Sequence, residues 1–314
     1  MEIRETLDKD IDGIRELFKI CFNKELSREE WEWKYRRSPW GSYSVVAVDG
    51  DNVVAHYGGI RNKFYLDGKT LYAYQFCDVM THPRYRAYPF SKRPLTAQLN
   101  EMFYRERQMD FAYGFPSIRH TRLQCIRLGG EGYGYVRLYK KAFIKDRARL
   151  WGLGFKVGWG LLEDDTIDRF ITNHDGTLQL VKDKGYIRWR YKENPRGDYT
   201  LGVSKRWGMT KGVVIFTLRD NWLNLLDLFL MDKDDIVNVI PSLEKHAINT
   251  YRHINGIRGW FHPKEPIIGH LMALGYNYED DIPYAYRTLN KGCGITVEIF
   301  LENYFYRMGD YDAA

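Results

Sequence analysis

The stretch WKYRRSPWGSY at residues 33–43 returns later in the chain as WRYKENPRGDY at residues 189–199. At a constant offset of 156, five of the eleven positions are identical, namely both Tyr positions, the Trp, the Pro and the Gly. Two more positions keep a positive charge in both copies. A repeat at this spacing predicts that the 314 residues fold as two similar units of about 150 residues each.

A second pair of segments supports the repeat. FAYGFPSIRHTRLQCIRLGG (111–130) resembles RGWFHPKEPIIGHLMALGY (258–276). Each segment reads as a short strand, a turn with Pro and a helix that ends at Leu-Gly, where Gly adopts the left-handed cap. The offset of these Leu-Gly pairs is 146, so the second copy lacks ten residues between the two motifs. The first copy carries its Pro- and Arg-rich loop in that interval.

The patterns between the motifs indicate an α+β fold with a mixed, mostly antiparallel sheet flanked by helices. The turns GDN (50–52) and DGK (67–69) join three strands as hairpins. A strand at 111–115, a helix at 118–128 and a final strand pair at 133–143 would close the first copy. The remaining predicted elements of this copy are the strands 3–6, 44–49, 53–66 and 70–81 and the helices 11–21, 28–36 and 91–108.

The repeat sets the expected domain boundaries. We expect an N-terminal domain at 1–145 and a connector rich in Gly and Trp at 146–170. A C-terminal domain at 171–290 and a C-terminal extension at 291–314 would follow, with the extension packing back on the fold.

Composition narrows the range of partners. The net charge is +6, but the 47 basic residues are spread along the chain among 41 acidic ones. The densest basic stretch, 84–93, is short, whereas an arm that binds a polyanion usually has a longer run. Nucleic acid is therefore an unlikely partner, and a small phosphorylated ligand fits this loop better.

Cysteine spacing and hydropathy point to a cytoplasmic protein without a metal. The four cysteines have no CxxC spacing, which argues against a zinc site or a disulfide framework. The first residues, MEIRETLDKDID, are charged and lack the apolar core of a signal peptide. No run approaches the roughly 18 apolar residues of a membrane span, so we expect no membrane partner.

Two motifs resemble the GNAT superfamily of acyl-CoA-dependent N-acyltransferases. CDVMTHPRYRAYPFSK (77–92) is similar to its motif A, a strand followed by Arg/Gln-x-x-Gly-x-Gly/Ala and a helix. YGFP (113–116), with a helix that ends in LGG (128–130), is similar to motif B. The likeness extends over nearly the whole chain and is greatest to bacterial acyltransferases with tandem GNAT folds, which implies two GNAT folds related by internal duplication.

The resemblance implies that the first copy holds acetyl-CoA or a related coenzyme A thioester. In the family, the backbone N–H groups of the loop and the helix N-terminus bind the pyrophosphate. This chain keeps Arg86 but has Pro89, which has no N–H, in place of the central Gly, and Ser91 in place of the last. The positions that match the coenzyme-binding strand and loop are Met80, Thr81, Arg86, Ala87, Tyr88, Phe90, Ser91 and Lys92.

The same resemblance implies two catalytic residues. Asp78 occupies the strand position where family members often carry a general base. Cys125 stands four residues before Gly129, where the family often has a Tyr that protonates the leaving thiolate. Either residue also has a structural interpretation, Asp78 bonded to nearby N–H groups and Cys125 as a small buried hydrophobe. His82 and His120 flank the expected cleft and are further candidates.

We therefore expect an acyl-CoA-dependent N-acyltransferase that acts on a primary amine of a small molecule or amino sugar. The alternative from another class is a catalytically degenerate GNAT-fold protein that binds a ligand or partner, which Pro89, Ser91 and Cys125 favour. A third possibility is transfer of an aminoacyl group from tRNA, against which the dispersed charge argues. The sequence leaves the oligomeric state open.

Overall fold

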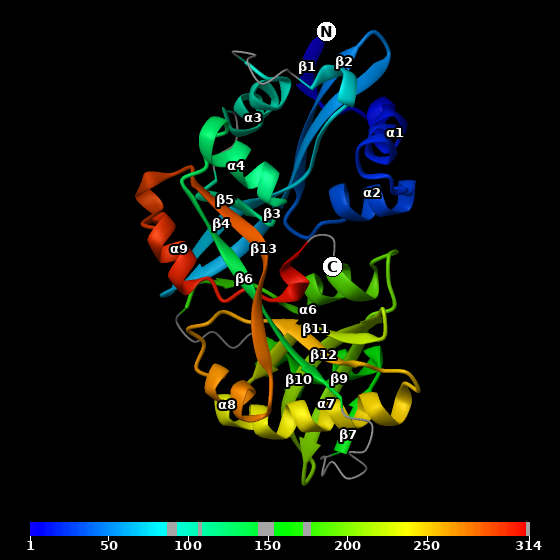
Figure 1. The fold of residues 1–314 in the computed structure, drawn as a ribbon, viewed down its shortest axis with the longest axis vertical. Helices are drawn as coiled ribbons and strands as arrows, with labels where there is room; N and C mark the ends of the chain where they lie inside the picture. The colour runs from blue at the N-terminus through cyan, green and yellow to red at the C-terminus, as the bar shows by residue number, and fades with distance from the viewer. Residues whose placement is uncertain (87–92, 106–108, 144–153, 172–176, 312–314) are drawn as a thin grey trace. The chain divides into compact units, whose positions relative to one another are not determined.

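The computed structural model describes residues 1–86, 93–105, 109–143, 154–171 and 177–311, and it divides the chain into two compact units (Figure 1). Unit 1 comprises residues 1–134, 193–196 and 283–301. Unit 2 comprises residues 135–192, 197–282 and 302–314. Each unit is therefore built from segments that are far apart in the sequence.

Unit 1 contains a mostly antiparallel sheet with the strand order β1-β2-β3-β4-β5-β13. The two predicted hairpins are present, and Asp67 and Gly68 of the second turn both have the positive φ that a tight hairpin turn requires. Among the pairings described for this sheet, β4 and β5 pair in parallel and the others are antiparallel. Its strands are β1 (Glu2–Glu5), β2 (Ser42–Asp49), β3 (Asn52–Leu66), β4 (Lys69–Thr81), β5 (Phe111–Gly114) and the second half of β13 (Asn277–Thr288).

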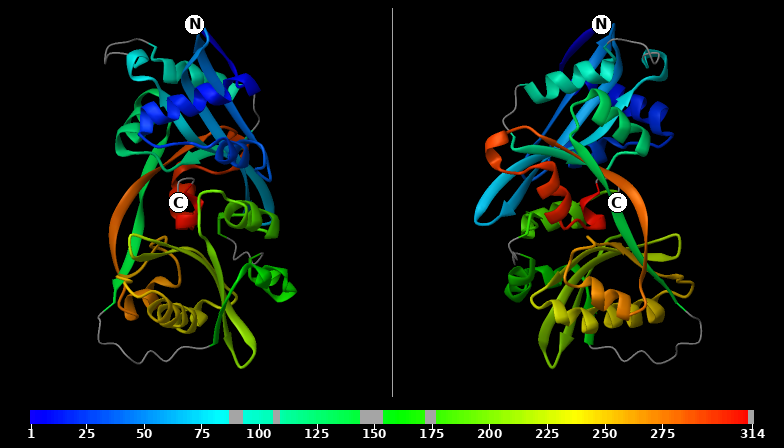
Figure 2. Two further views of the ribbon diagram at one scale, coloured as in Figure 1. Left: turned by 90° about the vertical axis from the view of Figure 1, so that its right-hand side faces the viewer. Right: turned by 60° about the vertical axis from the view of Figure 1, so that its left-hand side comes forward.

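Helices cover both faces of the unit 1 sheet. The helix α3 (Leu95–Arg105) lies on one face and α1 (Ile11–Phe22) on the other (Figures 1 and 2). Apolar residues of α3 recur at helical spacing, and Phe103 packs on Tyr43, Tyr57 and Tyr74. The remaining helices of unit 1 are α2 (Arg28–Tyr35), α4 (Ile118–Arg127) and most of α9 (Val297–Asn303).

Unit 2 repeats this order of elements. Its sheet runs β6-β12-β11-β10-β9-β7, and only β11 and β12 pair in parallel. Trp189 lies in a short helical segment before the first hairpin of unit 2, as Trp33 does in α2. The elements of unit 2 are β6 (Gly132–Ala142), β7 (Gly154–Val157), α5 (Asp165–Ile171), β8 (Gln179–Leu180), α6 (Lys184–Ile187), β9 (Thr200–Arg206), β10 (Met209–Arg219), β11 (Trp222–Leu230), α7 (Ile236–Thr250), β12 (Gly256–Trp260) and α8 (Ile268–Ala273).

The last strand of each unit comes from the other copy of the repeat. The strand predicted at 133–143 forms as β6, but it pairs with β12 in unit 2 instead of closing the first copy. β13 pairs with β5 and closes unit 1, with Ala285 opposite Gly114. Both strands follow a helix that ends at Leu-Gly. This local sequence pattern does not determine which strand each of them pairs with. Consequently the units do not follow the expected segments 1–145, 146–170, 171–290 and 291–314.

We predict that a fragment of residues 1–145 will not fold cooperatively, because it lacks the strand and helix that cover the β5 edge. In the intact chain Tyr286 of β13 and Phe300 of α9 both pack on Phe111 of β5, with ring centroids 5.6 Å away. Joining residues 283–301 to the fragment through a flexible linker should restore a single thermal transition in circular dichroism. Equal transitions with and without the added segment would contradict the exchanged arrangement.

Candidate active site

A β-bulge in the middle of β4 shapes the candidate site of unit 1. Gly58 of β3 pairs with Cys77 and His56 pairs with Met80, so Asp78 and Val79 both face Tyr57. Asp78 has a φ of 48°, in the left-handed region that bulges often use. The parallel pairing with β5 covers Ala73 to Gln75, before the bulge. The second half of β4 therefore runs past the end of β5 and opens one side of the sheet.

A cavity of about 580 Å³ lies at this opening. Its walls come from the end of α1, the second half of β4, the first turn of α3 and one face of α4. Apolar side chains such as Val79, Leu95 and Leu123 line its interior. This volume lies within the usual range for small-molecule and cofactor sites.

The described lining of this cavity is basic. It contains four arginines, Arg86, Arg119, Arg122 and Arg127, and none of its described residues is Asp or Glu. The Nε of Arg86 donates a hydrogen bond to the carbonyl oxygen of Thr81 at 2.9 Å, which fixes this side chain beside the end of β4. A cavity with apolar walls and a basic lining suits a ligand that combines an apolar arm with phosphate groups.

The structure brings three of the predicted coenzyme-binding residues together. Met80 and Thr81 are buried in the wall of the cavity, and Arg86 lines it. The other predicted residues, Ala87, Tyr88, Phe90, Ser91 and Lys92, lie outside the described residues, as does Pro89.

The predicted base Asp78 is a buried ion-pair partner. Both of its carboxylate oxygens lie 2.9 Å from the Nζ of buried Lys34, and the hydroxyl of Tyr35 donates to one of them at 2.7 Å. Burial alone would raise the pKa of Asp78, but the charges of Lys34 and His56 and these hydrogen bonds outweigh it and lower the pKa. Asp78 is therefore ionised and fully engaged, and the cavity wall begins one residue later, at Val79.

Cys125 lies away from the cavity. The face of α4 that lines it includes His120, Leu123 and Ile126, whereas Cys125 is exposed and is not among the described lining residues. At 3.6 residues per turn, its position is about 200° around the helix from Leu123 and about 100° from Ile126. Partial burial raises the pKa of its thiol, so the thiol is protonated at neutral pH. No described contact therefore supports the prediction that Cys125 protonates the leaving thiolate.

His120 is the candidate that the structure places in the cavity. Its Nε2 lies 2.9 Å from the side-chain amide nitrogen of Gln124, one turn further along α4. Gln124 in turn donates to the hydroxyl of Tyr57, which also accepts from Asn100. Burial lowers the pKa of His120 to about 4, so its imidazole is neutral at physiological pH. The other predicted histidine, His82, accepts a bond from the N–H of Arg84 through Nδ1 and caps a short turn.

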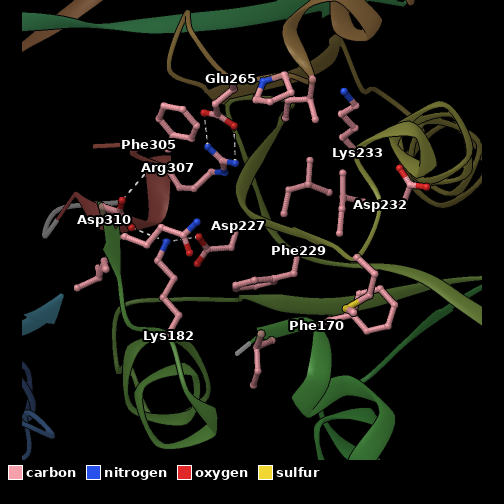
Figure 3. Close-up of a pocket in the computed structure, with 18 residues that line it drawn as sticks. Phe170, Lys182, Asp227, Phe229, Asp232, Lys233, Glu265, Phe305, Arg307 and Asp310 are labelled. Atoms are coloured by element: carbon pink, nitrogen blue, oxygen red, sulfur yellow. Dashed lines mark hydrogen bonds and ion pairs between the residues drawn. The ribbon is translucent and has the colours of Figure 1, made fainter. Parts of the chain in front are cut away.

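Unit 2 has a cavity in the corresponding place. It measures about 470 Å³ and lies between the second half of β11, the end of α5 and the residues before α8. Figure 3 shows buried charged side chains gathered on one side of it and Asp232 and Lys233 on the other. Arg307 is held by Glu265 through two contacts of 2.6 and 2.7 Å, so its charge is neutralised within the unit.

The ion-paired aspartate also has a counterpart in unit 2. In unit 2 the hydroxyl of Tyr191 donates to Asp227 on β11, as Tyr35 does to Asp78 on β4. The cation beside Asp227 is Lys182, which also lies 2.5 Å from Asp310. Burial and the neighbouring Asp310 raise the pKa of Asp227 even though Lys182 opposes them. The two tyrosines keep the offset of 156 that defines the repeat, but the two aspartates stand at a different offset, so the sequence repeat does not include them.

We predict that Lys34→Met lowers the free energy of unfolding by about 3–5 kcal/mol at pH 7, because it leaves a buried carboxylate without its cation. The pairing lowers the pKa of Asp78, so its stabilisation is present above the ordinary carboxyl pKa and is lost as pH falls through the lowered value. Urea unfolding should show the difference from wild type narrowing in acid. The exposed Lys24→Met serves as the control, and an equally small effect at both positions would contradict the argument.

Within the described parts of the chain, no helix is long and apolar enough to cross a membrane. The same residues contain no group of three or more His, Cys, Asp or Glu side chains arranged to hold a metal ion.

Comparison with solved structures shows which proteins share this fold. A conserved protein of unknown function from Enterococcus faecalis V583, described as a probable N-acyltransferase, has a TM-score of 0.70 at 12% identity, over 92% of this chain and 72% of its own. A GCN5-related N-acetyltransferase from Anabaena variabilis has a TM-score of 0.66 at 13% identity, over 92% and 74%. Another from Kribbella flavida has a TM-score of 0.60 at 15% identity, over 92% and 72%.

Sequence comparison identifies the domain itself. No protein of curated function matches the chain by sequence. The family model of the acetyltransferase (GNAT) domain matches residues 2–122, a range that contains β1 to β5 and most of the residues that line the unit 1 cavity. Residues 2–122 of the chain thus match a GNAT acetyltransferase domain.

Proposed function

We propose that the protein is an acyl-CoA-dependent N-acyltransferase that uses acetyl-CoA to acylate a primary amine of a small molecule or amino sugar. The observation that carries this proposal is the basic cavity at the bulge of β4, most of whose lining residues lie in the segment that matches the GNAT domain. Its apolar interior suits the pantetheine arm, and its arginines suit the phosphates. The edge of β4 beyond β5 offers backbone groups with which the arm would pair like an added strand.

The reaction needs the amine and the thioester to be held together. The amine nitrogen attacks the thioester carbonyl carbon, the C–S bond breaks, and the thiolate leaves and takes up a proton. If the amine binds in its neutral form, the site needs mainly to position it against the thioester, and no strong base is needed to deprotonate it first. This fits a site where Asp78 is already paired with Lys34 and where neutral His120 faces the cavity. Asp78 then acts by fixing the bulge, and proton transfer from the amine falls to water or to His120.

A catalytically degenerate protein that binds an acyl-CoA is the second candidate. The placement of Cys125 outside the cavity lining favours it, because the family's thiolate-protonating position is then unused. The release of free coenzyme A thiol from acetyl-CoA, measured with a panel of amines and amino sugars, separates the two candidates. An enzyme releases thiol in proportion to the amine, and a binding protein does not.

We predict that acetyl-CoA binds to the wild-type protein and that Arg86→Ala weakens binding by about 1.5–3 kcal/mol, the range for hydrogen bonds to charged groups. The reason is that Arg86 lines the cavity while its Nε is held by Thr81, which orients the guanidinium. Isothermal titration calorimetry measures the change, with the exposed Arg252→Ala as the matched control. Wild-type binding that Arg86→Ala leaves untouched would place the donor elsewhere.

We predict further that coenzyme A occupies unit 1 alone. The unit 2 cavity holds Asp227, Glu265 and Asp310, and its buried cations Lys182 and Arg307 are already paired with these carboxylates. A pyrophosphate would meet little free positive charge there. Crystals soaked with coenzyme A should show density at the β4 cavity, and density near residues 231–240 would contradict the prediction.

A further inference from the structure

The cavity of unit 2 has no part in the proposed function. It measures about 470 Å³, and all of its described lining residues belong to unit 2. Five charged side chains, each buried or half-buried, gather on one side of it (Figure 3). Apolar side chains, among them Phe170, Phe229 and Ile267, form much of the remaining lining. A cavity of this size with an apolar wall and a few polar groups is typical of a small-molecule site.

The charges that line this cavity do not cancel. Three of the five groups on the buried side are carboxylates and two are cations. They are Asp227, Glu265, Asp310, Lys182 and Arg307. On the opposite side, the exposed Asp232 and Lys233 carry one charge of each sign. When all of these groups are ionised, the described lining therefore carries one negative charge in excess.

The excess charge lies at the carboxylates of Asp227 and Asp310, because one lysine serves both. The Nζ of Lys182 contacts Asp227 and lies 2.5 Å from Oδ1 of Asp310. The other cation, Arg307, is engaged with Glu265. Burial raises the pKa of Asp227, Lys182 opposes this effect, and the charge of Asp310 adds to it. These two carboxylates therefore hold more negative charge than Lys182 balances.

The corresponding aspartate of unit 1 is placed differently. Asp78 has a lysine partner in Lys34, and it is not among the described residues that line the unit 1 cavity. Asp227, in contrast, shares its lysine with a second carboxylate and lines the cavity of its own unit. The polar side of the unit 2 cavity therefore presents carboxylates to a ligand, and a further cation would complete its charge balance.

We infer that the unit 2 cavity binds a small organic monocation, a primary ammonium group carried on an apolar body. The ammonium N–H groups donate to the carboxylates of Asp227 and Asp310, and charge-assisted bonds of this kind are stronger than neutral ones. The apolar body lies against Phe170 and Phe229, whose ring faces also attract a cation. The inference goes beyond the proposed function, which uses the cavity of unit 1.

Calorimetric titration of the full chain with benzylamine tests this inference, because benzylamine is a cation at neutral pH and has a small apolar body. Benzyl alcohol is neutral and benzoate is an anion, and both resemble benzylamine in shape. We expect benzylamine to bind, and both control ligands to bind at least about tenfold more weakly, the loss for one hydrogen bond to a charged group.

Two aspartate variants locate the ligand. Asp310→Asn removes one charge and keeps the shape of the side chain, so it should weaken benzylamine binding about tenfold to a hundredfold. Asp220→Asn is the matched control, because Asp220 lies at an exposed turn of unit 2 and is not among the described lining residues. Its φ of 53° is one that Asn tolerates. This variant should bind benzylamine as wild type does.

Thermal unfolding by circular dichroism checks that Asp310→Asn is folded. Phe229→Leu gives an independent test, because it keeps the apolar wall but removes an aromatic face, and it should weaken benzylamine binding about threefold to tenfold. The inference is overturned if wild type does not bind benzylamine at millimolar concentration, or if it binds benzyl alcohol or benzoate as tightly. Benzylamine binding that a folded Asp310→Asn variant leaves unchanged would also overturn it, because the amine would then bind elsewhere.

Discussion

A buried tyrosine–aspartate hydrogen bond at a bulged central strand organises each unit. In unit 1 Tyr35 of α2 reaches Asp78 on β4, and Gly58 of β3 leaves room for it, since an added Cβ there would lie 2.2 Å from the Tyr35 hydroxyl. The bond ties the second helix to the strand at the point where the strand leaves its parallel neighbour. A buried carboxylate needs a cation as well as hydrogen bonds, and Lys34 supplies it. The opening that becomes the cavity thus depends on a satisfied polar cluster beneath it.

In each unit a lysine pairs with the buried aspartate, but the two lysines come from different positions of the repeat. Lys34 precedes Tyr35 directly, but the residue before Tyr191 is Arg190, whose guanidinium donates to backbone carbonyls of Gly309 and Tyr311. Lys182 therefore pairs with Asp227, and the C-terminal segment adds Asp310 to the same cluster. The charged groups that line the unit 2 cavity therefore include carboxylates paired with cations, whereas none of the described residues lining the unit 1 cavity is Asp or Glu. One scaffold thus gives two cavities of different chemistry.

The exchange of β6 and β13 between the units is a feature that the sequence did not predict. The hydrophobic and turn patterns predicted the strand at 133–143, because alternation and Gly turns are local properties. Pairing is not local: β5 pairs with β13, some 170 residues later, and the strand that follows α4 pairs with β12. Burial of Tyr286 against Phe300 and Phe111 stabilises the observed pairing, and these aromatic contacts join residues that the repeat assigns to different copies.

The sequence by itself determined the α+β class, the hairpins, the repeated helix with its Trp and Tyr, and the likeness to the GNAT family, because each rests on spacing or on a short motif. It also identified the β4 strand, where Met80 and Thr81 prove to line the cavity. Only the tertiary structure decided that Asp78 is paired with Lys34, that Cys125 is exposed and is not among the described residues of the cavity lining, and that Arg119 and Arg122 belong to that lining. Those properties depend on which side of a helix or strand meets a distant segment, and that is fixed by packing between elements far apart in the chain.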